Sequence, residues 1–170
     1  SFIITKLGAK VNRVVVSGML ERLEPRETSN GATIWQGQLR DPSGLHYFSV
    51  GDYEPESMRE LVIDASKKLE SGDTLMMLMV AKARFFQNDE GAIYTSIRPE
   101  EGAIIGPSRY RQWLYEACKQ TLTRISNHQK AYSCEANAEA YAESGIEREW
   151  INGLLLSRSH YEMVDIEQYK

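Results

Sequence analysis

Cysteine and long apolar runs are both scarce in this sequence of 170 residues. Two cysteines, Cys118 and Cys134, are too few for a disulfide framework or a four-cysteine zinc site. We therefore expect reduced thiols in an intracellular protein. The longest apolar run, residues 75–81, is far shorter than the roughly 20 residues that cross a bilayer, which predicts no membrane partner.

Catalytic patterns are equally rare. Of the three histidines, none lies in an HExxH motif or at another recognisable ligand spacing, and no glycine-rich phosphate loop is present. Carboxylate pairs such as Glu100-Glu101 fall at predicted turns, where solvation explains them. The sequence therefore predicts a protein that is not an enzyme and needs neither a cofactor nor a metal.

Positive charge is not in excess. Lys and Arg total 20 against 24 Asp and Glu, which gives a net charge of −4 and excludes a histone-like polycation. A local basic groove remains compatible with this total, because a ligand responds to the local field rather than to the net charge.

Strand-like segments fill the first two-thirds of the chain. β-branched residues and turn signals predict strands over 11–23, 33–40, 45–50, 73–86 and 92–98. Asp41-Pro42-Ser43-Gly44 predicts a tight turn between the second and third strands. Pro99 is expected to end the fifth strand. Between the third and fourth strands, apolar residues at helical spacing predict a helix over 55–70.

This order predicts a mainly β fold with α: a five-stranded OB-fold β-barrel with a helix between strands three and four, followed by C-terminal helices. A generic α+β sandwich is the alternative. The expected divisions are an N-terminal extension (1–10), the barrel (11–104), a helix after the barrel (105–128) and a C-terminal helical extension (129–170). Barrels of this order commonly bind oligonucleotides, although fold alone does not imply function.

Strand alternation sorts the candidate binding residues. On the fourth and fifth strands the side chains expected inside the barrel are Met77, Met79, Ala81, Ala83, Phe85, Ile93, Thr95 and Ile97. The outward side chains combine cations and aromatics, as a single-strand track requires. The predicted nucleic-acid-binding residues are Trp35, Gln38, Arg40, Tyr47, Lys82, Arg84, Phe86, Tyr94 and Arg98.

Each candidate also has a structural interpretation. The cations can be the solvated cover of a barrel, and Phe86 can pack against a helix. Trp35 shares a face with Gly37 and Leu39, so it either packs at the barrel end or stacks on bases. Tyr53 can serve only to seat the following helix.

The helix after the barrel carries an apolar stripe with a tryptophan beside it. The predicted partner-interface residues are Tyr110, Trp113, Leu114, Cys118, Leu122 and Ile125. The stripe either docks on this chain's own barrel or serves other subunits, as a homo- or hetero-oligomer through the C-terminal helices.

Several motifs in this order resemble those of the archaeal replication protein A-associated proteins, which are single-OB relatives of the middle subunit of replication protein A. They are the turn 41–44, the run 47–56, Ile97-Arg98-Pro99-Glu100, Trp113-Leu114 and the run 121–125. The resemblance covers roughly residues 11–127.

That resemblance implies single-stranded DNA binding in a complex with a larger OB-fold DNA-binding subunit, acting in replication, repair or recombination. It also implies a cytoplasmic, nucleoid-associated location. It favours use of the helix after the barrel in a subunit bundle. The alternative function is an accessory subunit that assembles or regulates such a complex with little DNA contact of its own, and an RNA-binding OB protein is a third.

Overall fold

The computed structural model describes residues 2–161. The chain divides into two compact units. Residues 13–114 form one, and the described residues on either side, 2–12 together with 115–161, form the other. Among the described helices, none combines the length and the apolar character that crossing a membrane requires.

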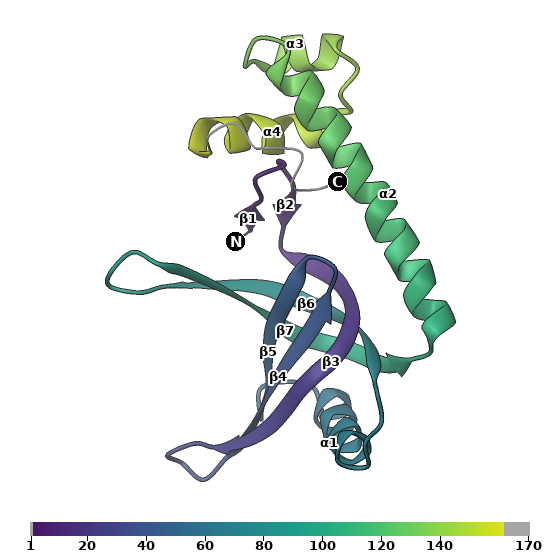
Figure 1. Cartoon of the computed structure of the whole chain (residues 1–170). Coiled ribbons are helices and arrows are strands. Elements are labelled where there is room, and N and C mark those ends of the chain that lie inside the picture. The colour runs from purple at the N-terminus through teal and green to yellow at the C-terminus, as the bar shows by residue number, and fades with distance from the viewer. Residues whose placement is uncertain (1, 162–170) are drawn as a thin grey trace. The chain divides into compact units, whose positions relative to one another are not determined.

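The first unit is a closed five-stranded barrel (Figure 1). Its strands are β3 (Arg13–Glu27), β4 (Thr33–Asp41), β5 (Gly44–Val50), β6 (Met76–Gln87) and β7 (Ile93–Ile105). They follow the spatial order β3-β4-β5-β7-β6, and β5 pairs with β7 in parallel. Helix α1 (Glu56–Glu70) connects β5 to β6. The predicted OB-fold barrel is confirmed, and the α+β sandwich is wrong because the sheet closes on itself.

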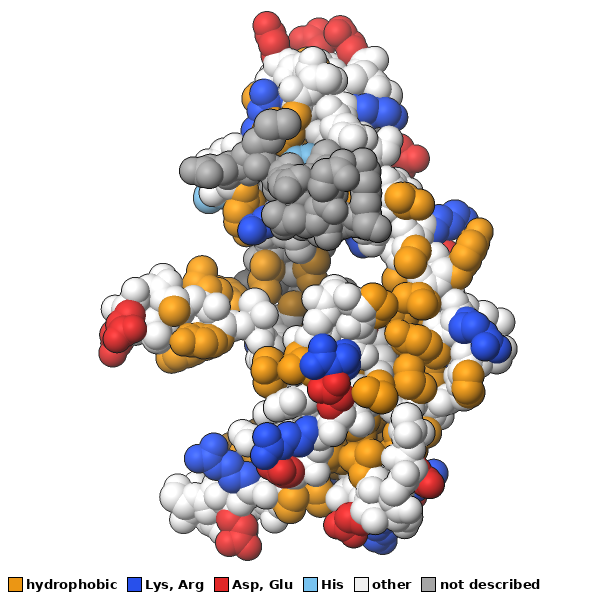
Figure 2. All heavy atoms as spheres, in the orientation of Figure 1, with side chains coloured by type: hydrophobic (Ala, Val, Ile, Leu, Met, Phe, Trp, Pro, Cys, Tyr) orange, Lys and Arg blue, Asp and Glu red, His pale blue; other side chains and the backbone are white. Residues whose placement is uncertain are grey.

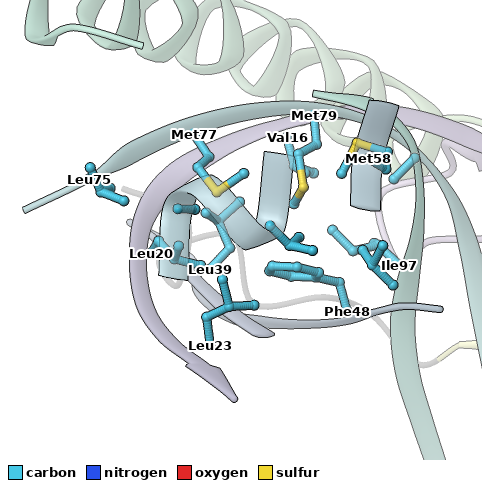
Figure 3. Close-up of a cluster of buried hydrophobic side chains, with 14 residues drawn as sticks. Val16, Leu20, Leu23, Leu39, Phe48, Met58, Leu75, Met77, Met79 and Ile97 are labelled. Carbon is cyan, nitrogen blue, oxygen red and sulfur yellow. The ribbon is translucent and has the colours of Figure 1, made fainter. Parts of the chain in front are cut away.

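Alternating side chains fill the barrel interior (Figure 3). Leu39, Phe48, Met77 and Met79 are almost completely buried, and Met58 of α1 packs into the same cluster. The ring of Phe48 lies across Gly37, where an added Cβ would come within 2.1 Å of the ring. The apolar alternation that predicted the strands therefore also defines the inner face.

Strands β6 and β7 extend beyond the barrel as a two-stranded arm, which Figure 1 shows projecting from it. The predicted inward placement is confirmed through Met77, Met79 and Ala81, which are fully buried. It is wrong for the strongly exposed Phe85 and for the exposed Ile93 and Thr95. These side chains lie past the end of the closed barrel, so no interior is left for them to enter.

Pro99 does not end the fifth strand as predicted. β7 continues to Ile105, and Pro99 itself is buried. The pairing with β6 shifts register between Val80 and Ala81, opposite Pro99 and Glu101. A bulge of this kind lets a strand contain a residue that has no N–H to donate.

The second unit combines both ends of the chain. It contains a short hairpin of β1 (Ile3–Ile4) and β2 (Lys10–Val11), most of α2 (Pro107–Tyr132), and the helices α3 (Ala138–Glu143) and α4 (Arg148–His160). Tyr141, Ile146 and Leu154 form its core with Ala131. Helix α2 runs to Tyr132, and α3 begins after Asn137, whose side chain accepts a hydrogen bond from the Ala140 amide at 2.8 Å.

Candidate nucleic-acid interface

Most of the predicted binding residues lie on one outward side of the barrel. Gln38 of β4 is directly opposite Tyr47 of β5, and Arg84 of β6 is opposite Ser96 of β7. The buried pair Phe48 and Ile97 joins β5 to β7, so the residues that flank this pair point outward together. Closure of the barrel therefore places Gln38, Tyr47 and Arg84 on one continuous surface.

The same surface continues onto the arm. Phe86 and Tyr94 are directly opposite each other on β6 and β7, one step beyond Arg84 in the alternation. Tyr47, Tyr94 and Phe86 are 51%, 59% and 65% exposed. Figure 2 shows hydrophobic side chains along the arm, with acidic side chains at its tip. Exposed rings of this kind offer faces on which bases can stack.

Two of the four predicted cations are held by acids. Arg98 donates to the Glu54 carboxylate at 2.9 Å and to the Tyr53 carbonyl at 3.4 Å. Arg40 forms a two-pronged ion pair with Glu21. The binding residues predicted from the sequence include no acid. The fold brings in Glu21 from β3 and Glu54 from the loop before α1.

Lys82 and Arg84 form no ion pair among the described residues, yet they lie close to a carboxylate. Glu100 accepts two hydrogen bonds from Arg13, at 3.0 and 3.1 Å. These bonds lower the pKa of Glu100, and the nearby charges of Arg13, Lys82 and Arg84 lower it further. The cluster therefore contains three cations around one acid, so its local charge is positive although the chain as a whole is acidic.

An open hollow of about 380 Å³ lies where β5 meets β7. Its lining combines hydroxyl, aromatic and charged side chains: Ser49, Tyr53, Glu54, Ser96, Ile97 and Arg98. Tyr53 is 91% exposed, so it does not seat the following helix. The hollow adds a fourth exposed ring beside the outward surface.

The sequence analysis misplaced three further residues. The first predicted strand ends at residue 23, but β3 continues to Glu27 and alternation places Arg26 outward with Arg22. Phe85 and Ile93 were assigned to the interior and lie instead on the opposite face of the arm. The signal that could have located Phe85 and Ile93 is the length of β6 and β7, which exceeds what one barrel wall needs.

Trp35 is separate from the outward surface. It pairs with Val50 in the β-ladder and packs, partly buried, against the main core cluster. Its face of β4 is the one that carries Gly37 and Leu39. The structure therefore places Trp35 at the packed side of the strand.

The predicted partner-interface residues do not form one surface. Trp113 donates its indole N–H to the Val15 carbonyl of β3 at 3.2 Å and stacks with Tyr110. Leu114 is half-buried, and Ile125 is buried with Leu7 in the helical unit. The members that remain exposed are Cys118 and Leu122.

Comparisons with known proteins find likeness in structure but not in sequence. No family model matches the chain. No curated protein matches it either.

Solved structures that the barrel resembles include two single-stranded DNA-binding proteins. One is from Thermus aquaticus, at 18% identity and a TM-score of 0.41, covering 57% of this chain and 51% of that one. Another, from Plasmodium falciparum and solved with single-stranded DNA, has 16% identity and a TM-score of 0.38, covering 56% and 93%.

The OBody NL8, solved bound to hen egg-white lysozyme, is similar at the same level, with 14% identity and a TM-score of 0.41 over 55% of this chain and 93% of that one. Neighbours at this distance include binders of DNA and of protein alike. The function must therefore be argued from the residues of this chain.

Proposed function

We propose that this chain binds single-stranded DNA through the outward surface of its barrel and arm. The observation that carries the proposal is the co-facial set of Tyr47, Phe86 and Tyr94, all exposed, beside Lys82 and Arg84. Rings supply stacking platforms that tolerate any base, and cations follow the phosphate backbone. The surface has both kinds of group in adjacent positions along β5, β6 and β7.

The finer proposal is a subunit of an archaeal replication protein A-like complex, acting in replication, repair or recombination beside a larger OB-fold subunit. Its support is the sequence resemblance over residues 11–127 together with the helix that follows the barrel. In this proposal the chain is a non-catalytic binding subunit located with the nucleoid in the cytoplasm.

A second candidate is an accessory subunit that assembles such a complex with little DNA contact. The ion pairs that occupy Arg40 and Arg98 favour it, since a paired arginine must leave its carboxylate before it can meet a phosphate. The net charge of −4 favours it as well.

The experiment that separates the two is a titration of the purified chain with fluorescent oligo-dT over a series of salt concentrations. Intrinsic DNA binding predicts micromolar or tighter affinity that weakens with salt. Lys82→Ala and Arg84→Ala should each lower the slope of log K against log salt by about 0.7, the value for one lost phosphate contact on a single strand.

Arg40→Ala is the matched control for these variants. Its guanidinium is already committed to Glu21, so the slope should change less than for Lys82→Ala. No binding even at low salt would contradict intrinsic DNA binding and favour the accessory subunit.

A further inference from the structure

An apolar groove lies on the helical unit, between α3 and α4. Its volume is about 660 Å³, within the roughly 300–1,000 Å³ typical of binding clefts. The floor is apolar: Ala138, Ala142, Ile146, Ile151 and Leu155. The two helices that form it are joined by a four-residue turn in which Gly145 has a positive φ of 81°.

The polar residues that line this groove are Glu139, Arg148 and Asn152, and the segment that forms much of it is acidic as a whole. Residues 135–149 contain five glutamates and one arginine. The glutamates are Glu135, Glu139, Glu143, Glu147 and Glu149, all of them exposed. None of the five takes part in an ion pair within the described part of the chain, and Figure 2 shows acidic side chains gathered over α3. We refer to these five glutamates as the rim, and an apolar floor within so acidic a segment fits a basic amphipathic helix.

Duplex DNA is a poor fit for the same surface. Two short helices joined by a tight turn resemble a DNA-reading helix-turn-helix in outline. However, such a reader depends on Lys and Arg to approach the phosphates, and residues 135–149 contain four more acids than bases.

Helix α2 of the chain itself has the complementary chemistry. It carries five basic residues and one acidic residue, Glu116. Tyr115 and Leu122 are each about two-thirds exposed and lie seven residues apart, with the exposed Cys118 between them on the same helix face. Arg111 and Lys119 flank this stripe and form no ion pair among the described residues.

We propose that the chain self-associates, with the Tyr115–Cys118–Leu122 stripe of α2 from each copy seated in the α3–α4 groove of the other. The contact is reciprocal, so each pair of copies uses two equivalent helix-in-groove contacts and closes as a dimer. Apolar burial stabilises each contact. The basic residues beside the stripe on α2 face the glutamates of the rim, and this charge complementarity determines which helix the groove binds.

The test uses the full chain and two charge-reversed variants in analytical ultracentrifugation. One variant reverses α2 (Arg111→Glu with Lys119→Glu), and the other reverses the rim (Glu139→Lys with Glu143→Lys). The wild type should dimerise, more weakly as salt rises. Each variant alone should associate at least tenfold more weakly, because like charges then face each other.

Mixing the two variants is the decisive measurement. In the mixed pair, reversed α2 meets the reversed rim and native α2 meets the native rim, so the heterodimer should recover the wild-type affinity. A mixture that stays monomeric would overturn the proposal.

Leu122→Asp should also abolish dimerisation, and Ile63→Asp, which alters an exposed apolar residue of α1, should leave it intact. Circular dichroism checks that each variant is folded. A wild type that is monomeric at all concentrations would overturn self-association and would mean that another protein occupies the groove. A dimer that persists in both the Leu122→Asp variant and the rim-reversed variant would also overturn the proposal. Oligo-dT affinity, measured in parallel, reports separately on the barrel surface.

Discussion

Phe86 and Tyr94 are the two residues whose placement matters most for the proposed DNA binding. They face each other across the arm in a register that the structure defines residue by residue. Two adjacent rings on a narrow ribbon can hold successive bases, whereas an isolated ring holds one. Their contribution should therefore be large compared with that of residues on the opposite face of the arm.

Replacing both rings, Phe86→Ala with Tyr94→Ala, should weaken oligo-dT binding sharply. Stacking is worth about 1–3 kcal/mol per base, so each lost platform should reduce affinity roughly 5- to 150-fold. Phe85→Ala removes an equally exposed ring from the other face and serves as the matched control. Fluorescence anisotropy measures all three proteins, and equal losses for the two faces would contradict the assignment of the surface.

At the residue scale, the sequence predicted on which face of a strand a side chain lies better than it predicted what surrounds that side chain. Alternation correctly placed Met77, Met79 and Tyr47, because each belongs to a strand segment inside the closed barrel. It failed for Phe85, since apolar character alone does not say where a barrel wall ends. Nor could alternation predict that Glu54 pairs with Arg98, because that contact links residues 44 positions apart.

The hairpin of β4 and β5 is an element whose turn is determined by local side-chain hydrogen bonds. The sequence predicted its turn, and Asp41 holds that turn by accepting hydrogen bonds from the Ser43 amide at 2.8 Å and the Ser43 hydroxyl at 2.6 Å. His46 lies 2.8 Å from its second oxygen. The arm differs, because its length depends on where β6 and β7 leave the barrel, and no local motif encodes that point.

Asp41 should make the stability of the barrel pH-dependent. Burial alone raises the pKa of Asp41, but the hydrogen bonds with His46 and Ser43 outweigh it, so the pKa lies below its usual value of 3.8. A lowered native pKa means stabilisation that is fully present above the unfolded pKa. That stabilisation is lost as the pH falls through the native value.

Asp41→Asn should therefore lower the free energy of unfolding by about 1–3 kcal/mol at neutral pH, because it removes hydrogen bonds to a charged group. The gap from the wild type should shrink as the pH falls below 4. Urea unfolding across this range measures it. Asp89→Asn, in the arm turn, is the control and should unfold like the wild type, and a gap independent of pH would count against the role of Asp41.

At the scale of the whole molecule, the segment that forms the barrel unit lies in the sequence between the two segments that form the helical unit. The N-terminal hairpin belongs to the helical unit, where the Ser157 hydroxyl donates to the Lys6 carbonyl at 2.6 Å and the Tyr161 hydroxyl donates to the Ile4 carbonyl at 2.8 Å. The sequence offered no sign of this arrangement. Contacts between residues more than 150 positions apart leave no periodic pattern to recognise.

Gly153 is the position at which this joining of the two ends can be tested. The backbone of Gly8 passes so close to α4 that a Cβ on Gly153 would lie 2.0 Å from the Gly8 carbonyl oxygen. Gly153→Ala must therefore displace the hairpin, at a cost of about 1–3 kcal/mol or more. Gly106→Ala is the control, because open space surrounds that position and its φ is not positive.

Hydrogen exchange followed by mass spectrometry should show faster exchange in Gly153→Ala over residues 3–11 and 148–160. The barrel strands should exchange as in the wild type, because the core of β3–β7 contains no residue of the hairpin or of α4. Gly106→Ala should leave both units unchanged. Faster exchange throughout the barrel of Gly153→Ala would mean that the two units unfold as one, and that the barrel depends on the joined ends for its stability.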